Sequence, residues 1–148
     1  MNNEATYEQI LDRFGQMVYS IRGGSMRPFL YSDRDAVLIR AKGIQRCKKY
    51  DAVLYRRDNG QYVLHRIVEV CPDSYVLQGD NCLQREPGIR DDQILGVLTG
   101  VIRKGTTLDV SKPSYRAAVC VWCALRPVRL MTFGRNIGGS IKKRLNRS

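Results

Sequence analysis

The pattern of apolar and polar residues along the chain changes near residue 16. Before that point, Ile10 and Phe14 recur at a helical interval, and Thr6 and Gln9 stand at the spacing at which two residues cap each other's backbone N–H groups. We therefore predict a short amphipathic helix over residues 6–15. After that point, short apolar runs are separated by turn residues, which predicts β-strands over 17–22, 35–41, 52–57, 61–70, 74–78 and 94–104.

Turn residues join several of these strands to their neighbours. An Asp-Asn-Gly sequence at 58–60 separates two runs at hairpin spacing, and Cys-Pro-Asp at 71–73 marks a second turn. The chain is therefore predicted to be mainly β, with antiparallel hairpins and a short N-terminal helix. Its 148 residues fit one such domain, divided into a helix over 1–16, a β-domain over 17–110 and a basic helical extension over 111–148.

Positive charge is concentrated at the C-terminal end. The chain holds 25 Lys and Arg against 14 Asp and Glu, and residues 111–148 contain nine of the basic side chains and none of the acidic ones. Such a segment suits an anionic lipid surface, a nucleic acid or an acidic protein. Because it has one Trp and few aromatic residues for base stacking, we expect no specific nucleic-acid partner. Residues 114–125 are predicted to be helical, with Pro127 ending or kinking the helix.

The cysteines predict a reducing compartment and no metal site. Their number is odd and no apolar signal segment precedes them: Cys47, Cys71, Cys82, Cys120 and Cys123. The last two form a Cys-x-x-Cys pair, but a structural zinc ion needs four ligands and the chain has no second such pair. We expect no metal and no cofactor. No stretch approaches 18 apolar residues, so we also expect no membrane-spanning helix.

A serine lies within a glycine-rich turn at residues 23–30, which read Gly-Gly-Ser-Met-Arg-Pro-Phe-Leu. The glycines let the backbone turn sharply and leave room for a peptide beside it, and Pro28 fixes the exit from the turn. A serine held on such a bend suits a nucleophile, whose oxygen must reach a carbonyl carbon. The same residues are also compatible with a turn that performs no chemistry.

Two further motifs supply groups that a serine nucleophile needs. His65 is the only histidine and shares a strand face with Val63 and Ile67, where a neutral imidazole suits either a general base or a structural role. The Gly-Asp-Asn sequence at 79–81 follows another strand. There Asp80 either orients a histidine or belongs to an ordinary turn.

In this order, the three motifs resemble those of the type I signal peptidase and LexA-like superfamily of serine peptidases. The likeness covers residues 17–104 and includes the Leu-His-Arg-Ile-Val sequence at 64–68. It is greatest to the branch, typified by the endoplasmic-reticulum signal peptidase, that uses histidine where the common bacterial branch has lysine. The resemblance implies a coiled antiparallel β-fold with a substrate strand along an exposed edge.

The resemblance also implies a role for each matching residue. Ser25 would be the nucleophile, His65 its general base, and Asp80 would orient His65 or shape the site. Three residues of the serine turn would border the substrate: Gly24, Met26 and Pro28. This branch has a second acidic residue after the Gly-Asp-Asn motif, and the candidates are Glu86, Asp91 and Asp92.

The activity implied is that of a serine endopeptidase that removes a leader or signal segment from a peptide or protein. A short polar helix replaces the family's N-terminal anchor, so the expected location is the cytoplasm or the inner membrane surface. Gly23 stands where many members have a serine that helps to bind the oxyanion, a donor worth about 2.7–4 kcal/mol. A second departure is Tyr50-Asp51, where the family usually has Gly-Asp.

Two alternatives use the same fold. One is a fragment of a LexA-like self-cleaving regulator, although the first 16 residues are too short for a DNA-binding domain. The other is a non-catalytic binding module, which Gly23 favours and which the retained Ser25 and His65 oppose.

We predict that residues 111–148 bind anionic membrane surfaces, because each Lys or Arg near such a surface contributes about 1 kcal/mol and Trp122 favours the interface. The full chain should sediment with anionic vesicles at low salt and be released as salt rises. A chain ending at Ser111 should stay in the supernatant. Equal vesicle binding by the two chains would contradict the prediction. The shorter chain should still cut a peptide if the tail only recruits it, whereas it should lose stability if 117–125 pack on the β-domain.

Overall fold

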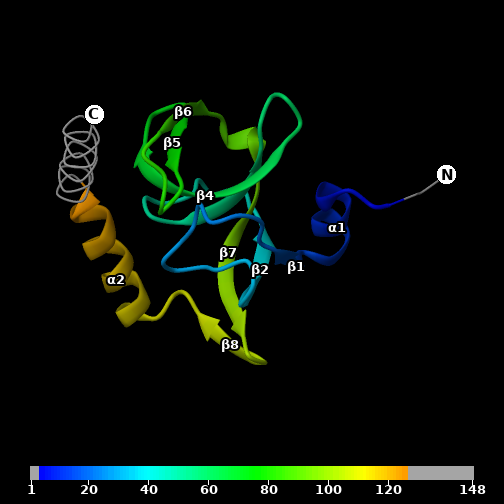
Figure 1. Ribbon diagram of the computed structural model, residues 1–148. Helices are drawn as coiled ribbons and strands as arrows, with labels where there is room; N and C mark the ends of the chain where they lie inside the picture. The colour runs from blue at the N-terminus through cyan, green and yellow to red at the C-terminus, as the bar shows by residue number, and fades with distance from the viewer. Residues whose placement is uncertain (1–3, 127–148) are drawn as a thin grey trace, which may run out of the picture.

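The computed structural model describes residues 4–126 (Figure 1). In chain order the elements are α1 (Tyr7–Phe14), β1 (Gln16–Ser20), β2 (Asp35–Ala41), β3 (Ala52–Arg56), β4 (Tyr62–Val70), β5 (Tyr75–Gln78), β6 (Glu86–Ile89), a short 3₁₀ turn (Asp91–Gln93), β7 (Ile94–Arg103), β8 (Thr106–Asp109) and α2 (Pro113–Ala124). The fold is therefore mainly β, with a short helix before the strands and a longer one after them, as predicted.

The strands form one antiparallel sheet in the order β1-β2-β7-β3-β4-β5-β6, and β8 also pairs with β7. One edge of the long strand β7 pairs with β2. The other edge pairs with β3 over residues 94–97 and with β8 over residues 100–103. The six predicted strands are confirmed to within two residues at each end. The sequence pattern did not predict β6 and β8.

Helix α1 forms where the caps predict it. The Thr6 hydroxyl accepts a hydrogen bond from Gln9 N at 3.3 Å, and Gln9 Oε1 accepts one from Thr6 N at 3.0 Å. Gly15 ends the helix in the left-handed conformation at φ 73°, which favours glycine. Leu11 is buried and joins α1 to the sheet.

Strand β3 is buried on both faces, so the sheet carries two separate apolar clusters. Ala52 and Leu54 belong to one cluster, and Val53 and Tyr55 belong to the other, because successive side chains of a strand point to opposite faces. Register shifts interrupt several pairings, as between β2 and β7 and between β3 and β7, and such bulges bend and twist a sheet. The result is the strongly curved β-structure of Figure 1.

The segment between β1 and β2 carries Ser25 and is anchored in the first apolar cluster. Met26 and Leu30 are each 1% exposed. The Asp35 side chain accepts a hydrogen bond from Tyr31 N at 2.9 Å and one from Arg103 Nε at 2.7 Å. Burial by itself would raise the pKa of Asp35, but these bonds and that of Arg34 lower it to about 2. The end of the segment is thus tied to β7.

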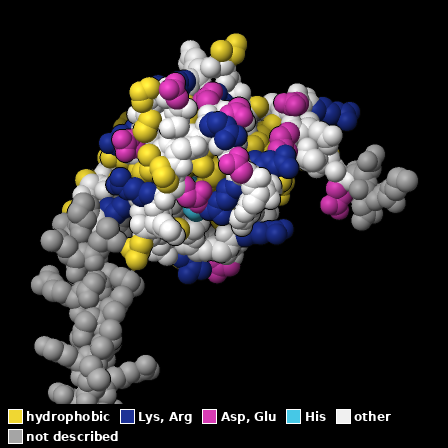
Figure 2. Space-filling model, turned by 90° about the horizontal axis from the view of Figure 1, so that it is seen from above, with side chains coloured by type: hydrophobic (Ala, Val, Ile, Leu, Met, Phe, Trp, Pro, Cys, Tyr) yellow, Lys and Arg dark blue, Asp and Glu magenta, His cyan; other side chains and the backbone are white. Residues whose placement is uncertain are grey.

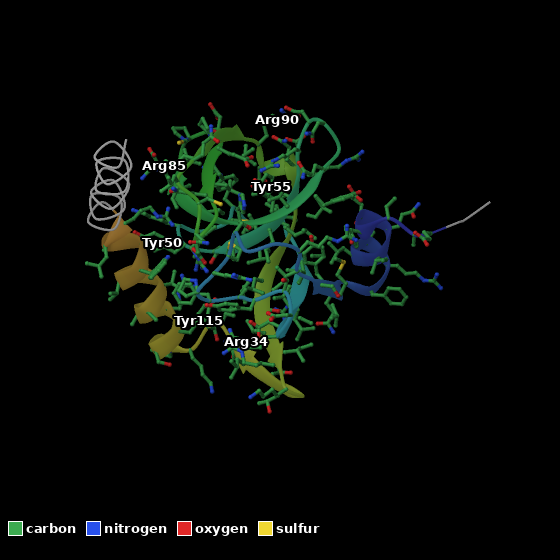
Figure 3. All side chains as sticks on the ribbon, in the orientation of Figure 1. Arg34, Tyr50, Tyr55, Arg85, Arg90 and Tyr115 are labelled. Atoms are coloured by element: carbon green, nitrogen blue, oxygen red, sulfur yellow. The ribbon has the colours of Figure 1, made fainter. Side chains whose placement is uncertain are left out.

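Helix α2 packs on the β-domain, so the first part of the basic extension belongs to the folded body. Val119 is 3% exposed, and Arg116 forms an ion pair with Asp51 at 3.6 Å. Tyr115 lies on the side of the helix that faces the body (Figure 3). None of the helices within residues 4–126 is long and apolar enough to cross a membrane. Pro127 and the rest of the basic segment lie outside the described residues.

Candidate active site

The structure brings the three predicted motifs together around Gly79. A Cβ atom on Gly79 would lie 2.7 Å from the carbonyl oxygen of Ser25, 3.1 Å from His65 Nε2 and 2.6 Å from Cys82 Sγ. Backbone and side-chain hydrogen bonds hold the contact, from Asn81 N to Ser25 O at 2.8 Å and from Asn81 Nδ2 to Gly24 O at 3.3 Å. Only glycine fits at such a close approach.

Ser25 and His65 line the same cleft, which has a volume of about 440 Å³. Ser25 is half-buried, whereas His65 is 7% exposed, and on the face shown in Figure 2 the histidine appears only as a small patch among acidic and basic side chains. No hydrogen bond joins the Ser25 hydroxyl to the imidazole in the part of the chain that the structure describes. In unliganded sites such bonds are often long and form only with the substrate.

Two unpaired strand edges border this cleft. β1 is the terminal strand of the sheet, and β4 pairs only with β3 until Arg66, where its pairing with β5 begins. Tyr7 of α1 packs edge-on against Tyr19 and Tyr62, with ring centroids 5.5 Å and 4.9 Å apart. The cleft is therefore lined by residues of two strands that have unpaired edges and by three tyrosines.

The imidazole of His65 is held by a hydrogen-bond chain on its Nδ1 side. Tyr55 Oη lies 3.3 Å from Nδ1 and donates a hydrogen bond to Glu86 Oε2 at 2.9 Å. The Tyr55 hydroxyl has a single hydrogen, which it donates to Glu86, so it can only accept a hydrogen bond from His65. The Nδ1–H group of His65 is therefore assigned as the donor to Tyr55. The proton on Nδ1 leaves Nε2 with a free lone pair, and Nε2 is the nitrogen beside Gly79 and the Ser25 turn.

Burial and charge act in opposite directions on the pKa of His65. Burial lowers the pKa of His65 from the ordinary value of 6.5, and the charge of Arg57 lowers it too. The carboxylates of Glu86 and Asp80 raise this pKa, but their effect is smaller than that of burial. The carboxylate of Glu86 lies 3.8 Å from Nδ1 and is itself bound by the Arg57 guanidinium. The imidazole is therefore neutral at pH 7, as a general base must be.

Asp80 is hydrogen-bonded to Arg66, and among the described residues no hydrogen bond or ion pair joins it to the imidazole. Its two carboxylate oxygens accept hydrogen bonds from Arg66 at 2.7 Å and 2.8 Å, and both side chains are buried. Arg66 also donates to Tyr50 O at 2.8 Å. These contacts fit the expected role of shaping the site rather than that of orienting His65.

Of the three other acidic candidates, Glu86 is the one beside His65. Asp91 binds Lys42 and Tyr75, and Asp92 binds Arg90. Sequence reasoning missed Tyr55 and Arg57. The register of the predicted hairpin was the available signal for Tyr55: His65 pairs with Val53, so Tyr55 is its diagonal neighbour on the same face.

The turn residues expected to border the substrate have different surroundings. Met26 packs in the core, so its side chain anchors the turn. Gly24 is half-buried and accepts the hydrogen bond from Asn81, and Pro28 is exposed. Gly23 has φ +70°, and nothing lies within 4 Å of the point where a Cβ atom would stand, so backbone conformation rather than space favours glycine there.

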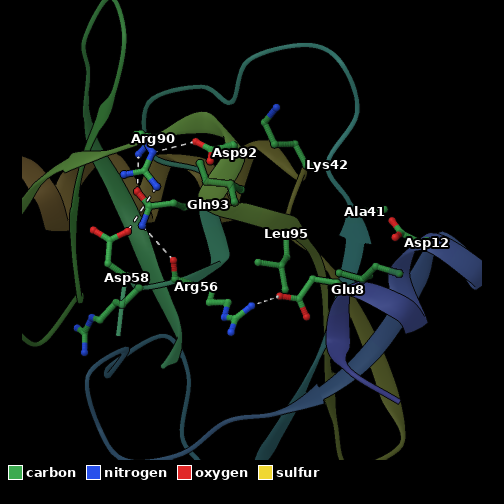
Figure 4. A pocket seen from close by; sticks show the side chains of 13 residues that line it. Glu8, Asp12, Ala41, Lys42, Arg56, Asp58, Arg90, Asp92, Gln93 and Leu95 are labelled. Carbon is green, nitrogen blue, oxygen red and sulfur yellow. Dashed lines mark hydrogen bonds and ion pairs between the residues drawn. The ribbon is translucent and has the colours of Figure 1, made fainter. Parts of the chain in front are cut away.

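Two other hollows of similar size contain neither Ser25 nor His65. One, of about 510 Å³, lies between α1 and the segment before β7 and is lined by ion pairs such as those of Arg90 with Asp58 and Asp92 (Figure 4). The other, of about 520 Å³, is lined by several basic residues: Arg40, Lys42, Arg46, Lys48 and Arg116. Within residues 4–126 no group of three or more His, Cys, Asp or Glu side chains could hold a metal ion, and all five thiols are free.

Comparisons of the chain with protein-family models, with curated proteins and with solved structures find no match.

We predict that Glu86→Gln lowers the pKa of His65 further, because the substitution removes the charge that raises it most. As the chain has one histidine, NMR titration of its imidazole signals reports this pKa directly. Asp92→Asn, in an exposed side chain that binds Arg90, is the matched control and should leave the titration unchanged. An unchanged or raised pKa in Glu86→Gln would contradict the assigned contact.

Proposed function

We propose that the protein is a serine endopeptidase that removes a leader or signal segment from a peptide or protein by Ser–His catalysis. The observation that carries the proposal is the position of Nε2 of the buried His65 next to the turn that bears Ser25, with Nδ1 facing the Tyr55 hydroxyl. The likeness of the three motifs to the signal peptidase and LexA-like superfamily supports it. The curved antiparallel sheet agrees with the fold expected for that superfamily.

In the proposed reaction Ser25 Oγ attacks the scissile carbonyl carbon while His65 Nε2 takes the hydroxyl proton. The protonated imidazole then gives this proton to the leaving amine, and an acyl-enzyme forms on Ser25. His65 next takes a proton from a water that attacks the ester carbonyl carbon, and it returns this proton to Ser25 Oγ as the acyl C–O bond breaks, which releases the carboxylic acid and restores the serine. Tyr55 and Glu86 hold Nδ1–H throughout, and the Glu86 carboxylate stabilises the imidazolium.

The oxyanion would be bound by backbone in this chain, since Gly23 has no hydroxyl. Within the described residues, the N–H of Ser25 takes part in no hydrogen bond of the turn. The N–H of a nucleophilic serine is a common oxyanion donor, because it lies close to the attacked carbonyl. Loss of the side-chain donor is expected to leave a slower enzyme.

An extended peptide fits the cleft best. Its backbone would pair with the free edge of β1 or with β4 before Arg66, which are the two unpaired edges at the cleft. The tyrosines that line the cleft would contact the side chains of the peptide. Action in the cytoplasm or at the inner membrane surface, with the basic C-terminal segment as the attachment, is part of the proposal and is tested by the vesicle experiment.

We predict that Ser25→Ala and His65→Ala each slow cleavage by about 10⁴-fold or more, because the nucleophile and its base act as one unit. The substrate is unidentified, so the probe is a mixture of proteome-derived peptides in which new termini are identified by mass spectrometry. Ser32→Ala, an exposed serine of the same segment, is the matched control and should cut like the wild type.

Melting temperatures of Ser25→Ala and Ser32→Ala should stay close to that of the wild type, whereas His65→Ala removes a buried side chain and is expected to melt somewhat lower while remaining folded. New termini produced at the wild-type rate by Ser25→Ala would overturn the proposal. A wild-type protein that produces none would instead favour the binding module.

A further inference from the structure

Helix α2 and Arg126, two residues after its end, contact the turn that carries Gly79 and the residue before that turn. Trp122 Nε1 donates a hydrogen bond to the backbone oxygen of Asp80 at 2.9 Å. Arg126, which is 7% exposed, donates from its guanidinium to Gln78 Oε1, in the residue before the turn. Gln78 Nε2 in turn donates to the backbone oxygens of Cys82 at 2.8 Å and of Leu83 at 3.1 Å. The helix and Gln78 together thus fix residues 78–83.

Residues 79–81 also hold the two proposed catalytic groups, Ser25 and His65. Asn81 binds the carbonyl oxygens of Ser25 and Gly24, and Gly79 lies against His65 Nε2. A continuous series of contacts therefore leads from α2 to the nucleophile and its base. A displacement of the turn would move both groups, and errors of about 1 Å in such a site cost on the order of 100-fold in rate.

A second set of contacts joins α2 to the serine-bearing segment directly. Phe29 packs edge-on against Tyr115 and Trp122, with ring centroids 5.7 Å and 6.2 Å apart. The Arg66 guanidinium, which binds Asp80, lies 5.5 Å from the centre of the Phe29 ring. Trp122 thus contacts the segment that bears Ser25 as well as the turn that supports it.

The helix contributes little to the core of the β-domain. Both apolar clusters consist of residues from α1, the strands and their connections, and neither includes a residue of α2. Besides the buried Val119 and the ion pair of Arg116 with Asp51, its contacts are made at the turn and at Phe29. This distribution is expected for an element that positions a site rather than one that holds the domain together.

We propose that α2 and the residues that directly follow it are a positioning element of the active site, in which Trp122 and Arg126 hold the Gly79–Asn81 turn against Ser25 and His65. The inference rests on the proposed function for its catalytic consequence. Docking of the C-terminal helix is then required for full activity. A chain ending at Ser111 loses the helix, and is therefore expected to lose cleavage and not merely recruitment.

Two substitutions in the full-length chain test this role. Trp122→Phe keeps an aromatic ring beside Phe29 but removes the indole N–H, and Arg126→Met removes the donors to Gln78 while keeping an unbranched side chain. Arg126→Lys keeps one donor and should restore part of the loss. Val121→Ala, in a side chain of the same helix that is 58% exposed, is the matched control.

We expect kcat to fall about 10- to 100-fold in Trp122→Phe and Arg126→Met on a peptide found in the library experiment, with KM changed by less than about 3-fold. Val121→Ala should behave like the wild type. The imidazole NMR signals of the single histidine supply a second readout that needs no substrate: they should shift in both variants and not in the control. Melting curves confirm that each variant is folded.

The two readouts separate this inference from the function on which it rests. Wild-type kcat and unshifted imidazole signals in both variants would overturn the positioning role even if Ser25-dependent cleavage is found. If the wild type cuts no peptide, the proposed function fails, while the NMR comparison still decides whether α2 positions His65. If Val121→Ala lowered kcat as much as the other two substitutions do, the loss would come from any change in the helix and not from the contacts of Trp122 and Arg126. That result would also overturn the inference.

Discussion

Three segments that are distant in sequence meet at Gly79, where a Cβ atom would overlap the Ser25 backbone and approach both His65 and Cys82. The contact lets the turn after β5 support the serine segment through Asn81 while it borders the imidazole on its Nε2 side. The helix after β8 reaches the same turn through Trp122. The candidate site and the C-terminal helix therefore depend on one close backbone approach.

The chemistry proposed for His65 follows from a balance between burial and a carboxylate. Burial favours the neutral imidazole, and Glu86 favours the charged one without outweighing burial. The carboxylate acts through the Tyr55 hydroxyl as well as by its charge, and so selects the tautomer with the proton on Nδ1. Asp80 is held by Arg66, an arrangement in which a buried guanidinium and a buried carboxylate satisfy each other's hydrogen bonds.

The sequence predicted most of the strands because apolar runs and turn residues are local signals. It did not predict β6, where Pro87 and Gly88 resemble turn residues, or β8, whose four residues are all exposed. Ser25 and His65 could be named as candidates because their motifs are short and specific. The sequence named Glu86 as one of three acidic candidates but could not choose among them, because Glu86 reaches His65 only through the pairing of β5 with β6, which no local pattern reveals. The contact of α2 with Asp80 is equally a product of tertiary packing.

The most direct test of the central claim is the pH dependence of the reaction of Ser25 with a fluorophosphonate, followed by mass spectrometry of the intact protein and of its peptides. In the proposed mechanism a neutral His65 is the active form, so the rate of labelling at Ser25 should be full at neutral pH. It should fall as the pH drops through the pKa of His65, which lies below 6.5. His65→Ala should remove this dependence together with most of the labelling. No adduct at Ser25, or labelling of His65→Ala at the wild-type rate, would contradict the account.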